Sequence, residues 1–339
     1  MNACVIGGGS WGSAFALHLG RKDLATRLWI REEDVYEYAL KYRENREFLP
    51  GSVFPSSVSF HHDLEEAVAG ADILFIAIPS EYCRSMYLRL LPILNPQTPM
   101  VSLTKGIEKE TLKRMSELME EVFTARFKPR VAALSGPSFA REVAESHPTA
   151  VVAASADMEL AKEVQHLASH SYLRIYTSND LVGVELAGAL KNVIAIAAGI
   201  SDGLEFGSNS LAALITRGIA EITRLGVQLG AKQETFSGLA GIGDLVLTCT
   251  GSLSRNRYVG YELGKGKPLE DIVSGMQMVA EGIGTTLSAQ RLAQREKVEM
   301  PILEQVYQIL YQAKDSRTAL QDLMSRKLRK EFVSEGEAL

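Results

Sequence analysis

The sequence predicts an α/β domain built on a doubly wound sheet, followed by an all-α domain. Up to about residue 177, short β-branched runs alternate with amphipathic segments, which is typical of a parallel sheet flanked by helices. After Ser178-Asn179-Asp180, a segment that can cap a helix N-terminus, strand patterns largely disappear. We therefore expect a boundary near residue 180, with one domain at 1–180 and a helical domain at 181–339.

Short apolar or β-branched runs in the first domain predict its strands. Several are apolar throughout, as strands buried on both faces of a sheet should be. The predicted strands are Ala3–Ile6, Thr26–Ile30, Val58–Phe60, Ile73–Ile78, Met100–Leu103, Val131–Leu134, Ala150–Ala153 and Leu173–Ile175. Between them, the apolar periodicity predicts helices at Ser13–Leu19, Leu64–Ala69, Leu112–Val122 and Met158–Ala168.

The second domain is predicted to be helical over Leu181–Ile200, Ser210–Leu229, Arg257–Lys265, Leu269–Ser274, Thr285–Arg295, Ile302–Tyr311 and Thr318–Leu323. The stretch from Leu186 to Ile200 is the only one that resembles a membrane span. It carries Lys191 and Asn192, and it is shorter than the ~20 apolar residues that a span needs. We expect an interior helix and no insertion into a membrane.

The composition suits a soluble globular protein. The chain has 339 residues, of which 46% are apolar and 23% charged, enough for two domains of roughly 150 residues each. The net charge is -5, and lysines and arginines are scattered among acids, so we expect no nucleic-acid surface. The N-terminus runs straight into a strand without the features of a signal peptide, which predicts a cytoplasmic protein.

Cysteines and histidines give no sign of a disulfide or a metal site. The three cysteines, Cys4, Cys83 and Cys249, are far apart and form no CxxC pair, which fits a reduced cytosolic protein. His166 and His170 have the i, i+4 spacing of a metal-binding pair, but no other ligand cluster accompanies them. We expect no metal.

The glycine motif near the N-terminus predicts a Rossmann-type dinucleotide site. Gly7, Gly9 and Gly12 form a GxGxxG motif that directly follows the first strand and opens a helix. Glycines allow a tight turn there and a close approach of the backbone to a pyrophosphate at the helix N-terminus. Ser10 and Trp11 would offer a hydroxyl and an indole N–H to the same phosphates. A purely structural glycine turn is the alternative.

The residue after the second strand bears on the choice between NAD and NADP. An acidic residue at this place binds the ribose 2′-OH of NAD, whereas here the strand ends in Arg31. A guanidinium can pair with the 2′-phosphate, so Arg31 favours NADP(H) over NAD(H). Glu32 and Glu33 follow at once, and Arg31 could pair with them at the surface instead.

Two further loops lie where a parallel sheet presents the carboxyl ends of its strands to a ligand. Thr104-Lys105-Gly106 follows one predicted strand, and Ser135–Ala140 follows the next. We expect Lys105 in the cleft, with Gly136 and Ser138 supplying donors to a substrate. The alternatives are a solvated lysine and a helix-capping turn.

The most informative residue of the helical half is Lys191. It interrupts a stretch of small and apolar residues whose helix belongs in an interior, where an unpaired ammonium costs on the order of several kcal/mol. A compensating partner or a function is therefore expected.

Three polar segments further along the chain are candidates for such partners. Asp244 follows a glycine-rich turn and could balance a buried lysine, whereas Ser254, Arg255 and Asn256 could hold an anion. Ser254 could also simply cap the next helix. In the loop Val279–Thr285, Glu281 could contact the cofactor or lie at the surface.

Together these motifs resemble the NAD(P)-dependent glycerol-3-phosphate dehydrogenase family in its bacterial form. The resemblance spans nearly the whole chain and is carried by Gly7-Gly-Gly-Ser-Trp-Gly12, Asn45-Arg-Glu-Phe-Leu-Pro-Gly51, Ser102-Leu-Thr-Lys-Gly-Ile-Glu108, Leu134-Ser-Gly-Pro-Ser-Phe-Ala140, Gly188-Ala-Leu-Lys-Asn192, Gly241-Ile-Gly-Asp244 and Ser254-Arg-Asn256. One small departure is Gly8, where the family commonly has alanine. The resemblance implies interconversion of dihydroxyacetone phosphate and sn-glycerol 3-phosphate, which feeds glycerophospholipid synthesis.

The resemblance also implies roles for individual residues. Lys191 would be the catalytic acid/base, with its pKa lowered by burial and by Lys105 and raised again by Asp244. The implied substrate contacts are Lys105, Gly136, Ser138, Lys191, Asp244, Ser254, Arg255 and Asn256. The implied cofactor contacts are Ser10, Trp11, Arg31, Lys105, Ala140, Arg255, Val279 and Glu281, beside the glycine turn of Gly7, Gly9 and Gly12.

Two other functions fit parts of the pattern. Another two-domain dehydrogenase, of the β-hydroxyacid or ketopantoate type, would handle a carboxylate rather than a phosphate. A non-catalytic NADP(H)-sensing module would keep the glycine turn but would need no lysine in the cleft. Lys105 and Lys191 argue against the second. The small-residue helical half further suggests a homodimer.

Overall fold

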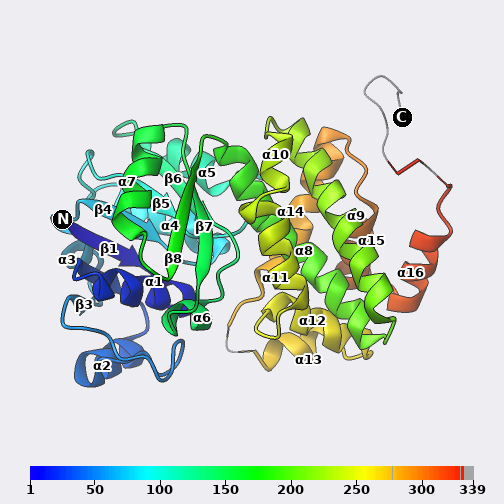
Figure 1. The fold of residues 1–339 in the computed structure, drawn as a ribbon, viewed down its shortest axis with the longest axis horizontal. Helices are drawn as coiled ribbons and strands as arrows, with labels where there is room; N and C mark the ends of the chain where they lie inside the picture. The colour runs from blue at the N-terminus through cyan, green and yellow to red at the C-terminus, as the bar shows by residue number, and fades with distance from the viewer. Residues whose placement is uncertain (277, 329, 332–339) are drawn as a thin grey trace.

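The computed structural model describes residues 1–276, 278–328, 330 and 331. It consists of a sheet flanked by helices and a second part made of helices alone, which lie side by side (Figure 1). The N-terminus lies at the outer edge of the sheet part, and α8 lies near the middle of the helical part. The expected α/β domain followed by an all-α domain is confirmed.

The sheet has eight strands in the order β3-β2-β1-β4-β5-β6-β7-β8. Their bounds are β1 Asn2–Ile6, β2 Ala25–Trp29, β3 Val58–His61, β4 Ile73–Ile76, β5 Met100–Ser102, β6 Val131–Ser135, β7 Thr149–Ala154 and β8 Leu173–Ser178. Each predicted strand is present, with ends that differ from the prediction by at most three residues. The expectation of a wholly parallel sheet is wrong at one edge, because β7 runs antiparallel to β6 and β8 follows the direction of β7.

Helices cover both faces of the sheet, as a doubly wound fold requires. Those of the first half are α1 Ser10–Arg21, α2 Glu33–Tyr42, α3 Leu64–Val68, α4 Ser80–Leu90, α5 Met115–Phe123, α6 Ala140–Ala144 and α7 Met158–Ala168. Phe15 of α1 and Leu160 of α7 belong to one buried apolar cluster, whereas Tyr87 of α4 and Leu118 of α5 belong to another. The helices α2, α4 and α6 were absent from the sequence prediction.

The helical part is built around α8 Leu181–Gly203, which packs against α9, α11, α12, α14 and α15. The other helices are α9 Gly207–Gln228, α10 Gln233–Phe236, the π-helical turn η1 Leu239–Gly243, α11 Asp244–Thr250, α12 Arg255–Gly264, α13 Leu269–Ser274, α14 Glu281–Glu296, α15 Pro301–Gln312 and α16 Ser316–Met324. Within the described residues, α8 is the one single helix long and apolar enough to span a membrane, and 89% of its most apolar window is buried inside the protein. The helix is longer than predicted, and protein surrounds it.

A seam of glycines brings α8 and α12 into close contact. A Cβ at Gly199 would overlap the carbonyl oxygen of Arg257, and one at Gly260 would overlap the carbonyl oxygen of Ile196. Gly203 lies equally close to the backbone of Tyr261. Two helices can approach this closely only where neither carries a side chain, so the seam fixes the distance between α8 and the start of α12.

Candidate active site

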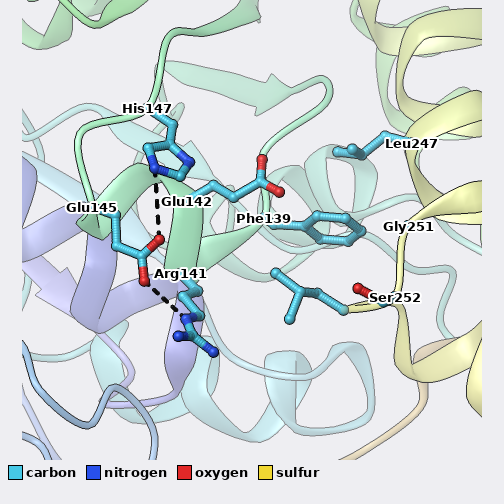
Figure 2. A pocket seen from close by; sticks show the side chains of 9 residues that line it. Phe139, Arg141, Glu142, Glu145, His147, Leu247, Gly251 and Ser252 are labelled. Atoms are coloured by element: carbon cyan, nitrogen blue, oxygen red, sulfur yellow. Dashed lines mark hydrogen bonds and ion pairs between the residues drawn. The ribbon is translucent and has the colours of Figure 1, made fainter.

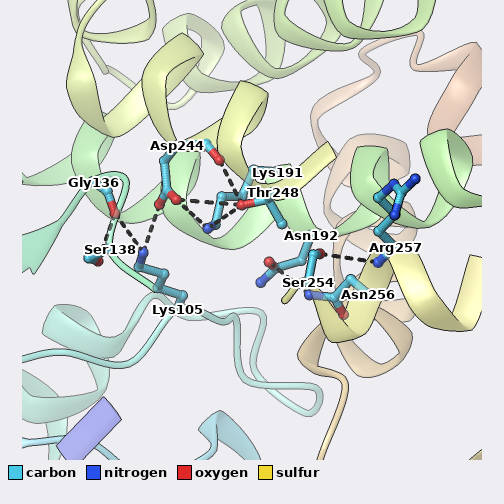
Figure 3. A network of polar contacts seen from close by, with 10 residues as sticks. All are labelled: Lys105, Gly136, Ser138, Lys191, Asn192, Asp244, Thr248, Ser254, Asn256 and Arg257. Carbon is cyan, nitrogen blue, oxygen red and sulfur yellow. Dashed lines mark hydrogen bonds and ion pairs between the residues drawn. The ribbon is translucent and has the colours of Figure 1, made fainter. Parts of the chain in front are cut away.

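Lys191 lies on α8 with 6% of its surface exposed, and its ammonium donates two hydrogen bonds to α11. Its Nζ donates to Oδ1 of Asp244 at 2.5 Å and to Oγ1 of Thr248 at 2.8 Å (Figure 3). Asp244 and Thr248 lie one turn apart on α11, and that spacing aims both side chains at α8. The buried ammonium therefore has the compensating carboxylate that the sequence led us to expect.

Lys105 reaches the same carboxylate from the sheet domain. Its Nζ donates to Oδ2 of Asp244 at 2.7 Å and to the carbonyl oxygen of Gly136 at 3.1 Å. Ser138 donates its hydroxyl to that carbonyl at 2.9 Å. Figure 3 shows the two lysines converging on Asp244 from opposite sides. The structure thus brings together five predicted site residues, on a carboxylate shared between the domains.

Burial and charge set the proton affinity of Lys191. Burial lowers its pKa from the usual 10.5 to about 8, Asp244 opposes that shift, and Lys105 adds to it. The directions expected from the sequence are confirmed. An ammonium with a pKa near 8 is charged at neutral pH and can still exchange its proton, as an acid/base group must.

A second polar group joins α8 to α12 and α14. Asn256 donates its amide to Oδ1 of Asn192 at 3.0 Å and accepts the backbone N–H of Gly282 at 2.9 Å. Ser254 caps α12, because its hydroxyl accepts the backbone N–H of Arg257 at 3.2 Å. The capping alternative for Ser254 is therefore confirmed, and it leaves the first turn of α12 beside Asn192.

The two arginines at the start of α12 point in different directions. The guanidinium of Arg257 turns away from Lys191 and pairs with Asp202 at 2.5 Å (Figure 3). Arg255 is exposed and donates to the carbonyl oxygen of Val279 at 3.0 Å. Of these two side chains, Arg255 is the one available to a ligand in the cleft.

The glycine turn after β1 has the geometry of a pyrophosphate cradle. Gly7 has a φ of 119°, and a Cβ at Gly12 would overlap the carbonyl oxygen of Gly7, so α1 packs closely on the turn. By contrast, a Cβ at Gly9 would meet no atom within 4 Å. Within the described residues, the buried Nε1 of Trp11 has no hydrogen-bond partner. Open space above the turn and an unused donor beside it fit a phosphorylated cofactor.

Arg31 lies at the end of β2, exposed over 61% of its side chain. Its guanidinium pairs with Glu32 at 2.6 Å, and the carbon Cζ lies 5.5 Å from the ring centre of Tyr82. The surface pairing considered from the sequence is therefore present. The guanidinium also remains accessible to a ligand.

The remaining predicted cofactor residues surround the junction between the domains. Ala140 opens α6, and Glu281 opens α14 rather than lying in a loop. The Glu281 carboxylate accepts the backbone N–H of Ser80 at 3.0 Å and its hydroxyl at 2.7 Å. It thereby supplies the N-terminus of α4 with the acceptor that Pro79 cannot offer. Burial raises the pKa of Glu281.

A separate hollow of about 300 Å³ lies where α6 faces α11 (Figure 2). It is lined by Phe139, Arg141, Glu142, Glu145, His147, Leu247, Gly251, Ser252 and Leu253. None of the lysines or carboxylates of the shared network lines it. The guanidinium of Arg141 pairs with Glu145 across its rim, and we assign the hollow no role in the chemistry.

Three site residues were missed from the sequence. Thr248 lay on an unpredicted helix, although its i, i+4 spacing from Asp244 was the available signal. Ser80 gave no signal, because its partner is 201 residues away. The buried hydroxyl of Ser135 lies beside Gly188, 2.6 Å from where a Cβ would be. In the part of the chain that the structure describes, no three His, Cys, Asp or Glu side chains could hold a metal ion.

Comparison with known proteins agrees with this geometry. Residues 2–161 match the NAD-dependent glycerol-3-phosphate dehydrogenase N-terminus family, and residues 180–321 match the corresponding C-terminus family. A relative named glycerol-3-phosphate dehydrogenase [NAD(P)+] from Koribacter versatilis is 54% identical, over 95% of this chain and 96% of its own. One of the same name from Syntrophotalea carbinolica is 53% identical, over 98% and 100%. The crystal structure of glycerol-3-phosphate dehydrogenase from Coxiella burnetii superposes with a TM-score of 0.92 at 39% identity, covering 96% of this chain and 99% of that one.

Proposed function

Because the chain belongs to the NAD-dependent glycerol-3-phosphate dehydrogenase family over both of its halves, we propose that Lys191 is the acid/base group with which it interconverts dihydroxyacetone phosphate and sn-glycerol 3-phosphate. The protein is an oxidoreductase that uses a nicotinamide cofactor. The reduction consumes one NAD(P)H and one proton for each ketone converted to an alcohol. The observation that supports the assignment best is the single carboxylate of Asp244 held between Lys191 and Lys105.

Lys191 donates the proton that the reduction needs and accepts it again in the oxidation. When bound, the nicotinamide supplies a hydride to the carbonyl carbon, and negative charge then develops on the carbonyl oxygen. The ammonium of Lys191 stabilises that oxygen and protonates it, and in the reverse direction the neutral amine removes the hydroxyl proton. Asp244 and Thr248 fix the position of Nζ, since both accept its hydrogen bonds.

The substrate phosphate is assigned to the start of α12. The positive end of this ten-residue helix and the guanidinium of Arg255 suit a dianion. Asn256 holds that first turn against α8, Ser254 caps it, and Gly136 and Ser138 border the opposite wall beside Lys105. A carboxylate substrate of the β-hydroxyacid or ketopantoate type is also an anion, so the start of α12 disfavours it only modestly.

NADP(H) is assigned as the preferred cofactor, with NAD(H) as a second one, and no metal takes part. The glycine turn with Ser10 and Trp11 holds the pyrophosphate, and Arg31 pairs with the 2′-phosphate by giving up Glu32. Lys105, Ala140, Arg255, Val279 and Glu281 complete the cofactor site. The protein works in the cytoplasm as a homodimer without nucleic-acid or membrane partners, and its product supplies glycerophospholipid synthesis.

One assay tests the function. Purified protein is mixed with NADPH and dihydroxyacetone phosphate, and the absorbance of NADPH is followed, with ketopantoate as the competing substrate and NADH as the competing cofactor. We expect oxidation of NADPH with dihydroxyacetone phosphate and a higher kcat/KM with NADPH than with NADH. Turnover of ketopantoate alone would contradict the assigned substrate. Binding of NADPH without any turnover would instead indicate a non-catalytic sensing module.

A further inference from the structure

The segment between α2 and β3 reaches back beneath the glycine turn. It comprises residues 43–57 and carries Asn45, which is 0% exposed. The amide of Asn45 donates to the carbonyl oxygen of Gly8 at 2.7 Å and to the hydroxyl of Ser13 at 2.9 Å. Ser13 in turn donates to the same Gly8 carbonyl at 3.1 Å. Two buried donors from different segments thus hold a single carbonyl of the turn.

The direction of this carbonyl determines the direction of the next N–H. The structure has no cis peptide bond in its described residues, so the Gly8 carbonyl and the Gly9 N–H lie on opposite sides of one planar peptide. Because Asn45 holds the carbonyl toward the interior, the Gly9 N–H points outward. That N–H donates to no protein atom in the described residues, and the space beside Gly9 is open.

We propose that Asn45 is a positioning residue for the cofactor: by holding the Gly8 carbonyl inward, its amide aims the Gly9 N–H at the pyrophosphate. The inference rests on the proposed function, because it takes the dinucleotide as the ligand of the turn. Asn45 touches no part of the ligand itself. An N–H that is already aimed needs no reorientation on binding, so the contribution of Asn45 appears in cofactor affinity.

Oδ1 of Asn45 accepts the backbone N–H of Phe48 at 3.0 Å, but several other contacts also hold the 43–57 segment, which makes the proposal testable by substitution. Arg43 donates to the carbonyl oxygens of Phe54 at 3.0 Å and Val58 at 2.6 Å. Glu44 pairs with Val53 as an isolated antiparallel bridge and accepts the backbone N–H of Gly51 at 2.7 Å. The carbonyl of Asn45 also accepts the backbone N–H of Leu49, a bond that survives any side-chain change.

The chain offers a matched control on the same segment and the same helix. Ser57 donates its hydroxyl to the carbonyl oxygen of Gly20 at 2.7 Å, at the end of α1 far from the glycine turn. The Ser57→Ala variant therefore removes one contact between the segment and α1 without touching the Gly8 carbonyl. The Ser13→Ala variant removes the second donor to that carbonyl and leaves Asn45 in place.

The experiment measures NADPH binding by quenching of protein fluorescence, without substrate, together with KM and kcat. We expect Asn45→Ala to weaken NADPH binding and raise its KM by about 10- to 100-fold. At saturating NADPH, kcat and the KM for dihydroxyacetone phosphate should stay within about threefold of the parent protein. Ser13→Ala should weaken NADPH binding by about two- to fivefold, again with little change in kcat or in the KM for dihydroxyacetone phosphate. Ser57→Ala should leave NADPH affinity unchanged.

A purely structural role for Asn45 would give another pattern. The thermal midpoint and the active fraction would then fall, while the NADPH affinity of the remaining folded protein would stay at the parent value, and that result would overturn the inference. An equal loss of affinity in Ser57→Ala would overturn it as well. If Asn45→Ala does not fold, Ser13→Ala tests the inference instead, through a loss of NADPH affinity at unchanged kcat. Failure of the proposed function is distinguishable, because the parent protein would then bind NADPH without reducing dihydroxyacetone phosphate.

Discussion

At the scale of single residues, Asp244 determines what the two lysines can do. It accepts one hydrogen bond from each ammonium, through a different carboxylate oxygen. With 1% of its surface exposed, the carboxylate is shielded from bulk solvent. Lys191 is thereby held in a charged state at neutral pH, although burial lowers its pKa to about 8.

Removal of the Lys191 ammonium should abolish most of the proton transfer. We expect Lys191→Ala and the bulkier Lys191→Met each to lower kcat by about 10²- to 10⁴-fold, the usual contribution of a positioned acid/base group. NADPH affinity should change by less than about threefold, since no contact with the glycine turn is lost. Steady-state kinetics and fluorescence titration check both values, and turnover near the parent rate would refute the assignment.

The pKa of Lys191 predicts opposite pH dependences for the two directions. Reduction needs the ammonium, which is lost as the pH rises through about 8, so kcat for reduction should fall above that pH. Oxidation needs the neutral amine, so its kcat should fall below that pH. Asp244 raises the pKa, and Asp244→Asn should therefore move both profiles to lower pH. Profiles of kcat from pH 6 to 10 would show this, and a shift to higher pH would contradict it.

Arg255 and Arg257 form a natural pair of test and control. Arg255→Ala should raise the KM for dihydroxyacetone phosphate by about 10- to 100-fold, as expected for the loss of a charge-assisted bond to phosphate. Arg257 points away from the site toward Asp202, so Arg257→Ala should leave that KM unchanged. Equal KM values for dihydroxyacetone phosphate in the parent protein and in both variants would mean that the phosphate binds elsewhere.

At the scale of elements, the glycine seam between α8 and α12 sets the width of the active site. Lys191 lies on α8 and the proposed phosphate-binding turn opens α12, so the distance between these helices is also the distance between the two proposed functional groups. A methyl group at Gly260 would overlap the Ile196 carbonyl and push the helices apart.

The Gly260→Ala variant should therefore lose both stability and substrate affinity. Overpacking of this kind costs about 1–3 kcal/mol of unfolding free energy, and the KM for dihydroxyacetone phosphate should rise with it. The control is Gly275→Ala, where the new methyl group would have neighbours no closer than 3.7 Å. Denaturant unfolding and steady-state kinetics check both effects. If Gly260→Ala lost stability but kept its KM for dihydroxyacetone phosphate, the glycine seam would not determine the substrate affinity of the site.

Sequence patterns predicted the elements whose signals are local. The apolar runs located every strand, and the isolated Lys191 led to the carboxylate of Asp244, which the two lysines share. The reversal of β7 was missed, because the direction of a strand depends on its connection and not on its residues. The helix that carries Thr248 was missed because Gly241 and Gly243 indicated a turn there, whereas the chain forms a π-helical turn that leads into α11. Ser80 and Glu281 meet only through the packing of the two domains.

At the scale of the whole molecule, contacts between the two parts of the protein lie within the proposed cofactor site. Glu281 of the helical part accepts two hydrogen bonds from Ser80 of the sheet part. Gly106 makes room for this contact, since a Cβ there would lie 3.1 Å from the Glu281 carboxylate and would overlap the Ser80 hydroxyl. Ser288 on α14 also donates to the Ile107 carbonyl at 3.2 Å. These contacts couple the β4 and β5 loops to α14.

NADPH should therefore protect both parts of the protein at once. At about 1,000 times its Kd, a ligand of the folded state adds about 4 kcal/mol to the free energy of unfolding. We expect hydrogen exchange to slow in the first turns of α1 and α4 and also in the first turn of α14. Measurement by mass spectrometry with and without NADPH checks this. Protection confined to residues 1–180 would mean that the helical part does not take part in binding.

The shared carboxylate has a further consequence, which concerns the charge balance of the reaction. Two ammoniums and one carboxylate sum formally to a single positive charge, enclosed where little water can compensate it. A neutral ketone leaves this excess in place, whereas an oxygen that takes up negative charge cancels it. The fold therefore holds a positive charge beside the position where that oxygen would lie, while the nicotinamide that gives up the hydride would take on the balancing positive charge. Catalysis by this protein would then draw on a positive charge that the fold holds in place before the reaction begins and that attracts the oxygen most strongly in the transition state.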